Sequence, residues 1–184
     1  MATTDQQQRW AAEGRPAPKD RLARKKPMER RVPVPLDPQL VEELNDAMAE
    51  LEGARMAKVA QAELDRLADR AAVARAAVEA ETVTLTFRAV GRRAWDALLE
   101  EHPPTEEQDK EHRAEYKGAR APYNGDTFPP AAIHASLVAG GHDDISIEDV
   151  VGWCDDWNMT EIMELFAAAL EVNTQRRVAS LGNV

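Results

Sequence analysis

Residues that could do chemistry are few in this sequence and widely spaced. Of the four histidines, only His102 and His112 lie near each other, and a proline turn separates them. Neither has Cys, Asp or Glu at the spacing of a zinc site or an HExxH helix. We therefore predict no metal site. His102 is expected to cap the end of a helix, and His134 to lie on a helix surface.

The remaining reactive residue types also lack a partner. Asp143 and Asp144, like Asp155 and Asp156, form acidic pairs, but the central Gly and terminal Glu of a calcium-binding loop are absent. Cys154, the single cysteine, has no partner arranged for nucleophilic catalysis and is expected to be a small buried residue. No phosphate-binding glycine loop or nucleophile elbow occurs. The sequence thus predicts a non-catalytic protein without a cofactor.

Composition and charge limit the partners. Of the 184 residues, 30% are charged and only 5% aromatic, so we expect one packed region of roughly 90 to 100 residues. The net charge of −10 is uneven: residues 1–36 carry nine Lys or Arg against four Asp or Glu, and the rest carries 14 against 29. Nucleic acid is therefore not expected as a partner, except through the basic N-terminal segment. No apolar run reaches the length of a membrane span, so we expect a cytosolic protein unless a larger particle carries it.

Residues 1–36 predict a flexible basic arm. They combine scattered prolines with a cluster of Lys and Arg at residues 21–31, and they end in the extended, polyproline-like run VPVP at residues 32–35. Such a segment buries too little apolar surface to offset the entropy of ordering it. Deleting residues 1–36 is therefore expected to leave the melting temperature almost unchanged.

Residues 37–81 predict a long helix or a helical hairpin. Asp37 and Pro38 suit the N-cap and first helical position, and apolar residues then recur every three or four positions, with a phase shift near Gly53. A continuous helix of about 43 residues would span about 65 Å. Its apolar stripe, called the seam below, needs a partner. That partner is a second copy in a coiled coil, the helix folding back on itself, or another protein.

One stretch has the period of a β-strand. Val83, Leu85, Phe87 and Ala89 alternate with polar residues, which predicts a half-buried strand. A single strand must pair with another segment, because its backbone groups need partners. Strand addition to a neighbouring chain and an unrecognised hairpin partner within the chain are both open.

The chain from residue 92 onward predicts short helices. They are expected at residues 92–101, 129–139, 147–156 and 161–173, with a polar helix after Thr105. Ser146 opens a capping box whose acid is Asp149, and Thr160 caps the last helix. The predicted fold class is mainly α: a long, possibly kinked N-terminal helix, one short β-strand, then a compact bundle of short helices. The bundle domain is placed at residues 82–175, with a frayed tail at 176–184.

Short motifs in the second half of the chain resemble those of one protein family. They read FRAVGRRAWDALL at residues 87–99, HPPT at 102–105 and YNGDTFPPA at 123–131, followed by a last helix that ends near Asn173. Their order over residues 83–173 resembles tail assembly proteins of long-tailed phages that infect actinobacteria. The residues that carry the resemblance are Phe87, Gly91, Trp95, His102, Pro103, Pro104, Asn124, Thr127 and Phe128.

The resemblance implies a tail assembly chaperone. Such proteins bind the tape measure protein, keep this long helical polymer from aggregating and help recruit tail tube subunits, in the cytoplasm of the host cell. An alternative is a structural virion subunit, in the tail or the head-tail junction, laced to its neighbours by the basic arm and the strand. Self-association through the long helix or the strand is a further expectation. Under the chaperone hypothesis the partner contacts are Leu44, Leu51, Leu64, Leu67, Trp153 and Trp157.

Overall fold

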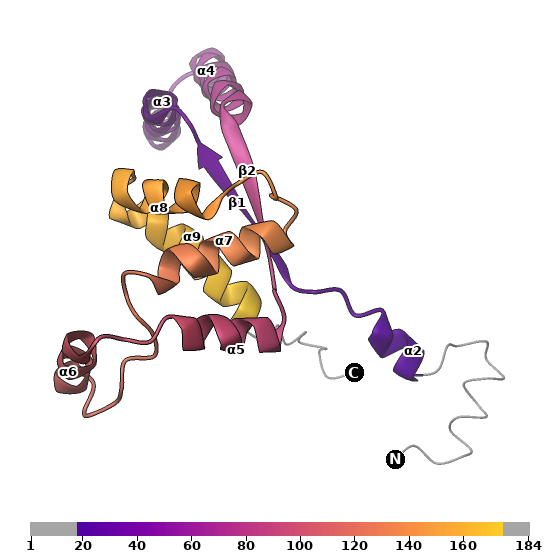
Figure 1. The fold of residues 1–184 in the computed structure, drawn as a ribbon. Helices are drawn as coiled ribbons and strands as arrows, with labels where there is room; N and C mark the ends of the chain where they lie inside the picture. Colours follow the sequence, from indigo (N-terminus) through magenta and orange to yellow (C-terminus); the bar gives the residue numbers. More distant parts are fainter. Residues whose placement is uncertain (1–17, 175–184) are drawn as a thin grey trace, which may run out of the picture.

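The computed structural model describes residues 18–174, which form a small sheet, a projecting helical hairpin and a set of packed helices (Figure 1). Strands β1 (Glu29–Pro35) and β2 (Thr82–Arg88) are antiparallel, and the hairpin of α3 (Pro38–Met56) and α4 (Gln61–Ala80) connects them. The short helix α2 (Pro18–Ala23) precedes β1. The helices after β2 are α5 (Arg92–Glu101), α6 (Glu106–Glu115), α7 (Phe128–Ala139), α8 (Ile147–Asp156) and α9 (Met159–Thr174).

Strand β1 lies in the segment that the sequence assigned to a flexible arm. Val32 stands opposite Leu85 in the antiparallel register, and the two side chains are only 2% and 4% exposed. The expectation of a single strand is therefore wrong, and so is the flexible arm for residues 29–35. Removing residues 1–36 would take away half of the sheet, so the expectation of an unchanged melting temperature is reversed. Residues 1–17 of the expected arm and the expected frayed tail at residues 176–184 lie outside the described residues.

The prolines of β1 suit a strand because of the direction in which their nitrogens point. The Leu36 N–H donates to the Glu81 carbonyl at 2.8 Å, and the register keeps the backbone of even-numbered β1 residues facing β2. Pro33 and Pro35 are odd-numbered, so their nitrogens, which carry no hydrogen, face the outer edge of the sheet. A run that reads as polyproline in the sequence is therefore an edge strand.

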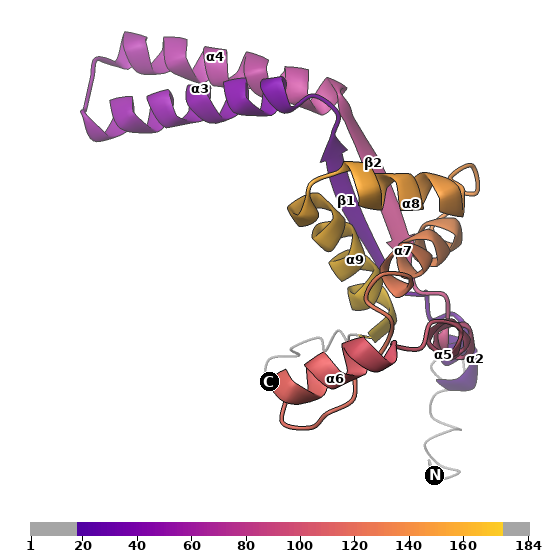
Figure 2. The same cartoon turned by 60° about the vertical axis from the view of Figure 1, so that its left-hand side comes forward.

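The seam is divided between α3 and α4, so the expectation of a single long N-terminal helix is wrong. The chain turns at residues 57–60, where Lys58 has a left-handed backbone conformation with φ of 53°. Gly53, near which the phase shift occurs, lies inside α3. The two helices then run back along each other, and Figure 2 shows the hairpin projecting from the rest of the molecule.

The hairpin has a small core of its own. Leu51 and Leu67 are buried there, with exposed fractions of 5% and 6%, beside Ala47 and Ala71. The alanines leave little side chain between the helices, so the two backbones can pack closely, although each alanine buries little area. The apolar stripe thus has its partner within the chain.

The sheet and helices α5 to α9, together called the body, share a separate core. Helices α7 and α9 pack against the sheet, and α8 packs against α7 and α9 (Figure 2). Phe87, Phe128, Ile133 and Leu137 have no exposed surface. Among the described residues, the buried cluster of the body and that of the hairpin have no member in common.

Local predictions for the second half agree with the structure. Strand β2 and helix α5 lie where the periodicity placed them. The predicted capping box forms at Ser146, whose side chain accepts from the Asp149 N–H. Thr105 caps α6 as expected, and it does so in a capping box with Gln108 that was not predicted. Helix α9 differs, because it begins at Met159 instead of after Thr160. Within residues 18–174, no helix is both long enough and apolar enough to cross a bilayer.

Candidate binding groove at the base of the hairpin

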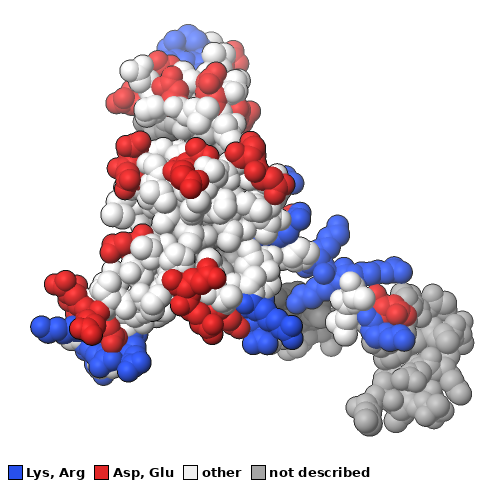
Figure 3. Space-filling view, viewed as in Figure 1, with Lys and Arg blue, Asp and Glu red and all other residues white. Residues whose placement is uncertain are grey.

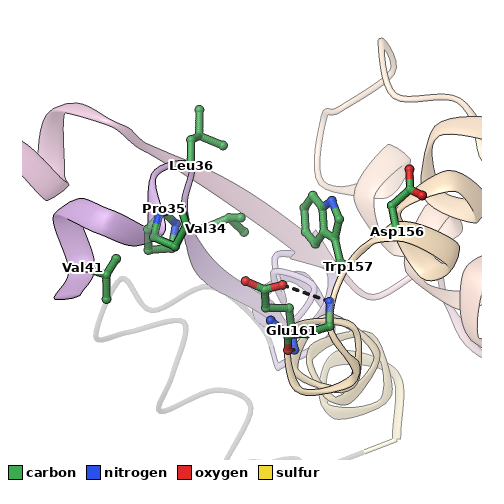
Figure 4. A pocket seen from close by; sticks show the side chains of 9 residues that line it. Val34, Pro35, Leu36, Val41, Asp156, Trp157 and Glu161 are labelled. Atoms are coloured by element: carbon green, nitrogen blue, oxygen red, sulfur yellow. Dashed lines mark hydrogen bonds between the residues drawn. The ribbon is translucent and has the colours of Figure 1, made fainter.

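A groove with a volume of about 490 Å³ opens between the base of the hairpin and the junction of α8 with α9. One wall is formed by the end of β1 and the start of α3, and the other by the α8–α9 junction (Figure 4). The mixture of apolar side chains with a few polar groups is typical of binding sites. The lining residues are Val34, Pro35, Leu36, Pro38, Val41, Asp156, Trp157, Asn158 and Glu161.

The first wall results from an abrupt change from strand to helix. Leu36 is still hydrogen-bonded to β2, and the next residue, Asp37, is already the N-cap of α3. The Asp37 carboxylate accepts from the Gln39 N–H at 2.8 Å, and Pro38 occupies the first turn. No loop separates the two elements, and the Leu36 side chain remains 58% exposed.

The second wall is centred on Trp157, which ends α8 in an extended conformation. Its backbone N–H donates to the Trp153 carbonyl at 2.9 Å, and the two indole rings stack with centroids 5.1 Å apart. Both tryptophans are half-buried and pack against the body core. The stack fixes the orientation of the Trp157 ring, so the groove has a rigid aromatic side.

The carboxylate of Glu161 is held in place by the cap of α9. Asn158 accepts from the Glu161 N–H at 3.1 Å, and Glu161 accepts from the Asn158 N–H at 3.3 Å (dashed in Figure 4). This reciprocal pair caps the helix where the sequence analysis expected Thr160. Asp156 and Glu161 make no ion pair with any residue in the 18–174 range. The groove therefore carries two carboxylates that no described Lys or Arg pairs with.

The sequence around both walls is uniformly acidic. Residues 32–54 contain six Asp or Glu and residues 121–174 contain ten, and neither stretch contains Lys or Arg. Basic residues gather instead along the segment that leads from α2 to β1, as Figure 3 shows at its right-hand side. The groove thus lies in a region of negative potential, away from the basic end of the molecule.

The partner contacts expected from the sequence lie in different places. Leu51 and Leu67 are buried in the hairpin core, and Leu64 packs against that core. Leu44 lines a second hollow, on the outer face of the sheet, together with Pro33 and Val78. Trp153 and Trp157 are stacked on each other, and of all six residues only Trp157 lines the groove. Leu51, Leu64 and Leu67 thus have packing partners within the hairpin, whereas Leu44 does not belong to that core. Contact of these residues with another protein stays a prediction.

The residues that carry the family resemblance come together around Phe128. Its ring lies against Trp95 in an edge-on contact with centroids 5.4 Å apart, and against His102 at 6.3 Å. Phe87 is fully buried in the same core, and Gly91 has φ of 90°, a conformation that favours glycine, between β2 and α5. These motif residues therefore hold α5 and α7 together.

Two turns of the motif are also joined by hydrogen bonds. The Asn124 N–H donates to the His102 carbonyl at 2.9 Å, and the His102 ring lies 3.0 Å from the Thr127 hydroxyl. The Asn124 side chain in turn accepts from the Thr127 N–H at 3.2 Å. His102 is the C-cap of α5, as expected, and Pro103 and Pro104 follow it. The motif is thus a structural joint, and it lies apart from the residues that line the groove.

The described residues contain no group of three or more His, Cys, Asp or Glu that could hold a metal ion. Burial and, to a smaller extent, the Asp155 carboxylate raise the pKa of the Cys154 thiol above its ordinary value. A protonated thiol is a poor nucleophile at neutral pH. His142 has a structural partner, since its Nε2 accepts from the Thr86 N–H at 2.9 Å.

Sequence reasoning missed most of the groove. Leu36 was assigned to the arm, because nothing in the sequence showed that the segment before Asp37 pairs with β2. Asp156 was considered only as part of an acidic pair that lacks the calcium-binding pattern, and Glu161 only as the first residue of the last helix. The absence of Lys and Arg from residues 121–174 is visible in the sequence, but its meaning depends on which segment lies opposite.

Comparison with known protein families, with curated proteins and with solved structures finds no match to this chain.

Proposed function

We propose that this chain is a tail assembly chaperone of a long-tailed phage, which acts without catalysis in the host cytoplasm. In this role it binds the tape measure protein and helps recruit tail tube subunits. The proposal combines the resemblance of residues 83–173 to such proteins with the groove at the base of the hairpin. The motif residues support it indirectly, because they form one connected structural joint instead of a scatter of unrelated positions.

The observation that carries the proposal is the open groove, which combines apolar side chains with two carboxylates that form no ion pair within residues 18–174. A chaperone for a long helical polymer must cover apolar side chains and later release them. Leu36 and Trp157 offer apolar surface that is already partly exposed to water, so a partner gains only moderate burial there. Modest burial with electrostatic attraction favours complexes that exchange rapidly.

The alternative of a structural subunit loses one of its supports. Its strand was expected to pair with a neighbouring chain, whereas β2 pairs with β1 of the same chain. The free edge of β1 lacks two N–H groups because of Pro33 and Pro35, and the Thr86 N–H on the edge of β2 is bonded to His142. Neither edge favours the addition of another strand.

Co-expression with the tape measure protein of the same phage tests the proposal. We expect the tape measure protein to remain in the soluble fraction and to copurify with this chain, and to aggregate when the chain is omitted. Mass spectrometry of purified phage particles is the second measurement, and we expect the chain to be absent or far below the copy number of tail subunits. Stoichiometric presence in the particle would instead support the structural subunit.

A further inference from the structure

We infer that the groove binds a cationic amphipathic segment, whose apolar side chains enter between Leu36 and Trp157 and whose Lys or Arg pairs with Asp156 or Glu161. That this segment belongs to the tape measure protein rests on the proposed function. The chemistry of the groove itself does not depend on it.

The apolar part of the inference follows from the two walls. The backbone at Leu36 is held by its hydrogen bond to the Glu81 carbonyl, and the Trp157 ring is held by its stack on Trp153. Both walls therefore hold their shape before any partner arrives, which lowers the entropy lost on binding. Val34 and Val41, both half-buried, extend the apolar surface along the first wall.

The charge of the partner follows from the acids. Asp156 and Glu161 are the ionisable residues of the lining, and both are negative and without an ion pair among the described residues. Asp155 and Asp156 end α8, where the helix dipole already places partial negative charge and where no basic residue compensates. A cation bound there would relieve this repulsion, and an anionic segment would add to it.

Two other occupants have suitable charge and must be distinguished. One is the chain's own terminus, residues 175–184, which includes Arg176 and Arg177. The other is the basic segment of a second copy, at residues 19–31. The walls are built from residues 34–41 and 156–161, and the stretches around them, 32–54 and 121–174, contain no Lys or Arg. A cation for the groove therefore comes from another part of the chain or from a partner.

The test uses the full-length protein and a designed, fluorescently labelled peptide of about 18 residues, which is five helical turns. The peptide carries Leu at helical spacing on one face and Lys at the flanking positions, and a matched peptide has Glu in place of Lys. By fluorescence anisotropy we expect the Lys peptide to bind at least about tenfold more tightly than the Glu peptide, with an affinity that falls as salt is raised. Equal binding of both peptides would overturn the inference.

Substitutions of groove residues test whether the peptide binds in the groove. Leu36→Arg puts a large cation across the opening, and we expect it to weaken binding by about tenfold or more. Met56→Arg is the matched control, because Met56 is 81% exposed at the far end of α3. Asp156→Asn combined with Glu161→Gln keeps the side-chain shapes, and we expect about a three- to tenfold loss with a weaker salt dependence. If Leu36→Arg binds the Lys peptide as tightly as the wild type does, the peptide does not bind in the groove and the inference is contradicted.

The remaining outcomes separate the occupants. If deletion of residues 175–184 tightens peptide binding, the chain's own terminus fills the groove. If the wild type is a dimer that Leu36→Arg converts to a monomer, a second copy fills it. Either result overturns the inference. If Leu36→Arg still retains the tape measure protein on co-expression, the inference fails and the proposed function stands. If the Lys peptide binds but the wild-type chain retains no tape measure protein, the proposed function fails and the groove chemistry stands.

Discussion

Phe128 illustrates at the scale of single residues why the motif of this chain serves the fold. Its ring stacks on Tyr123 with centroids 4.4 Å apart and meets Phe166 edge-on at 6.0 Å, so it joins α7, α9 and the preceding loop. A fully buried aromatic ring with several ring neighbours contributes both apolar burial and ring-ring contact energy. A resemblance built on such residues therefore concerns the fold, and the partner surface has to be found elsewhere.

The two capping boxes provide a test of charge at single residues. Bonds from the Ser146 hydroxyl and from the Ser146 N–H hold the pKa of the Asp149 carboxyl below its ordinary value of 3.8. Because the pKa is lowered in the folded state, the contribution to stability is present above pH 3.8 and is lost as the pH falls through the folded pKa.

We predict that Ser146→Ala raises the pKa of Asp149 toward 3.8, as followed by NMR titration of the carboxyl group. The difference in unfolding free energy from the wild type should shrink as the pH falls below that value. Thr105→Ala is the matched control, because the partner of Thr105 is the neutral Gln108. Its cost of about 1 kcal/mol should not change over the same pH range. Parallel pH dependence of the two variants would count against this account.

The sheet shows, at the scale of elements, how a two-stranded structure avoids pairing with other chains. Pro33 and Pro35 remove two of the outward N–H groups of β1. On the other edge, His142 accepts from the Thr86 N–H, and Gly140 lies so close to the Thr86 carbonyl that a Cβ there would be 1.8 Å from its oxygen. Each edge of the sheet is thus protected from pairing with another strand in a different way.

We predict that Pro33→Val combined with Pro35→Val leaves the monomer folded but makes it self-associate. Each lost proline costs about 0.4 to 1 kcal/mol through the entropy of the unfolded chain, and the strand preference of valine offsets part of this. Analytical ultracentrifugation over a concentration series should show stronger association than that of the wild type. Pro122→Val, in an exposed loop, makes the same chemical change away from the sheet and should remain like the wild type. A monomeric double variant would refute the role assigned to the prolines.

The described residues of the molecule form two units, the body and the hairpin, whose buried clusters have no member in common. The hairpin leaves the body through Leu36 and Glu81, which form a hydrogen-bonded pair at the end of the sheet. In an ordinary β-hairpin, a two-residue turn connects such a pair. The hairpin is therefore an insertion into a β-hairpin.

We predict that replacing residues 37–80 by Asn-Gly leaves the body folded, with a melting temperature within about 5 °C of the wild type. The described tryptophans all lie in the body, so near-UV circular dichroism reports its packing. Val32→Asp in the full chain is the opposite control and should abolish that signal, because it buries a charge in the core. An unfolded body after the replacement would show that the hairpin is needed for its stability.

The sequence by itself determined the elements whose causes are local. The alternation of β2 and the capping boxes at Thr105 and Ser146 involve residues a few positions apart, so their patterns could be recognised without knowing the fold. It also determined the charge asymmetry between residues 1–36 and the rest of the chain.

The tertiary structure alone decided which segments meet. The same apolar seam suits a coiled coil or a hairpin, and the choice depends on a turn around Lys58 that no Gly or Pro marks. Whether VPVP is polyproline or an edge strand depends on the register with β2, because only pairing fixes which way the proline nitrogens point. The groove brings residues 34–41 against residues 156–161, and a surface made by such distant segments exists only once both have packed on the body.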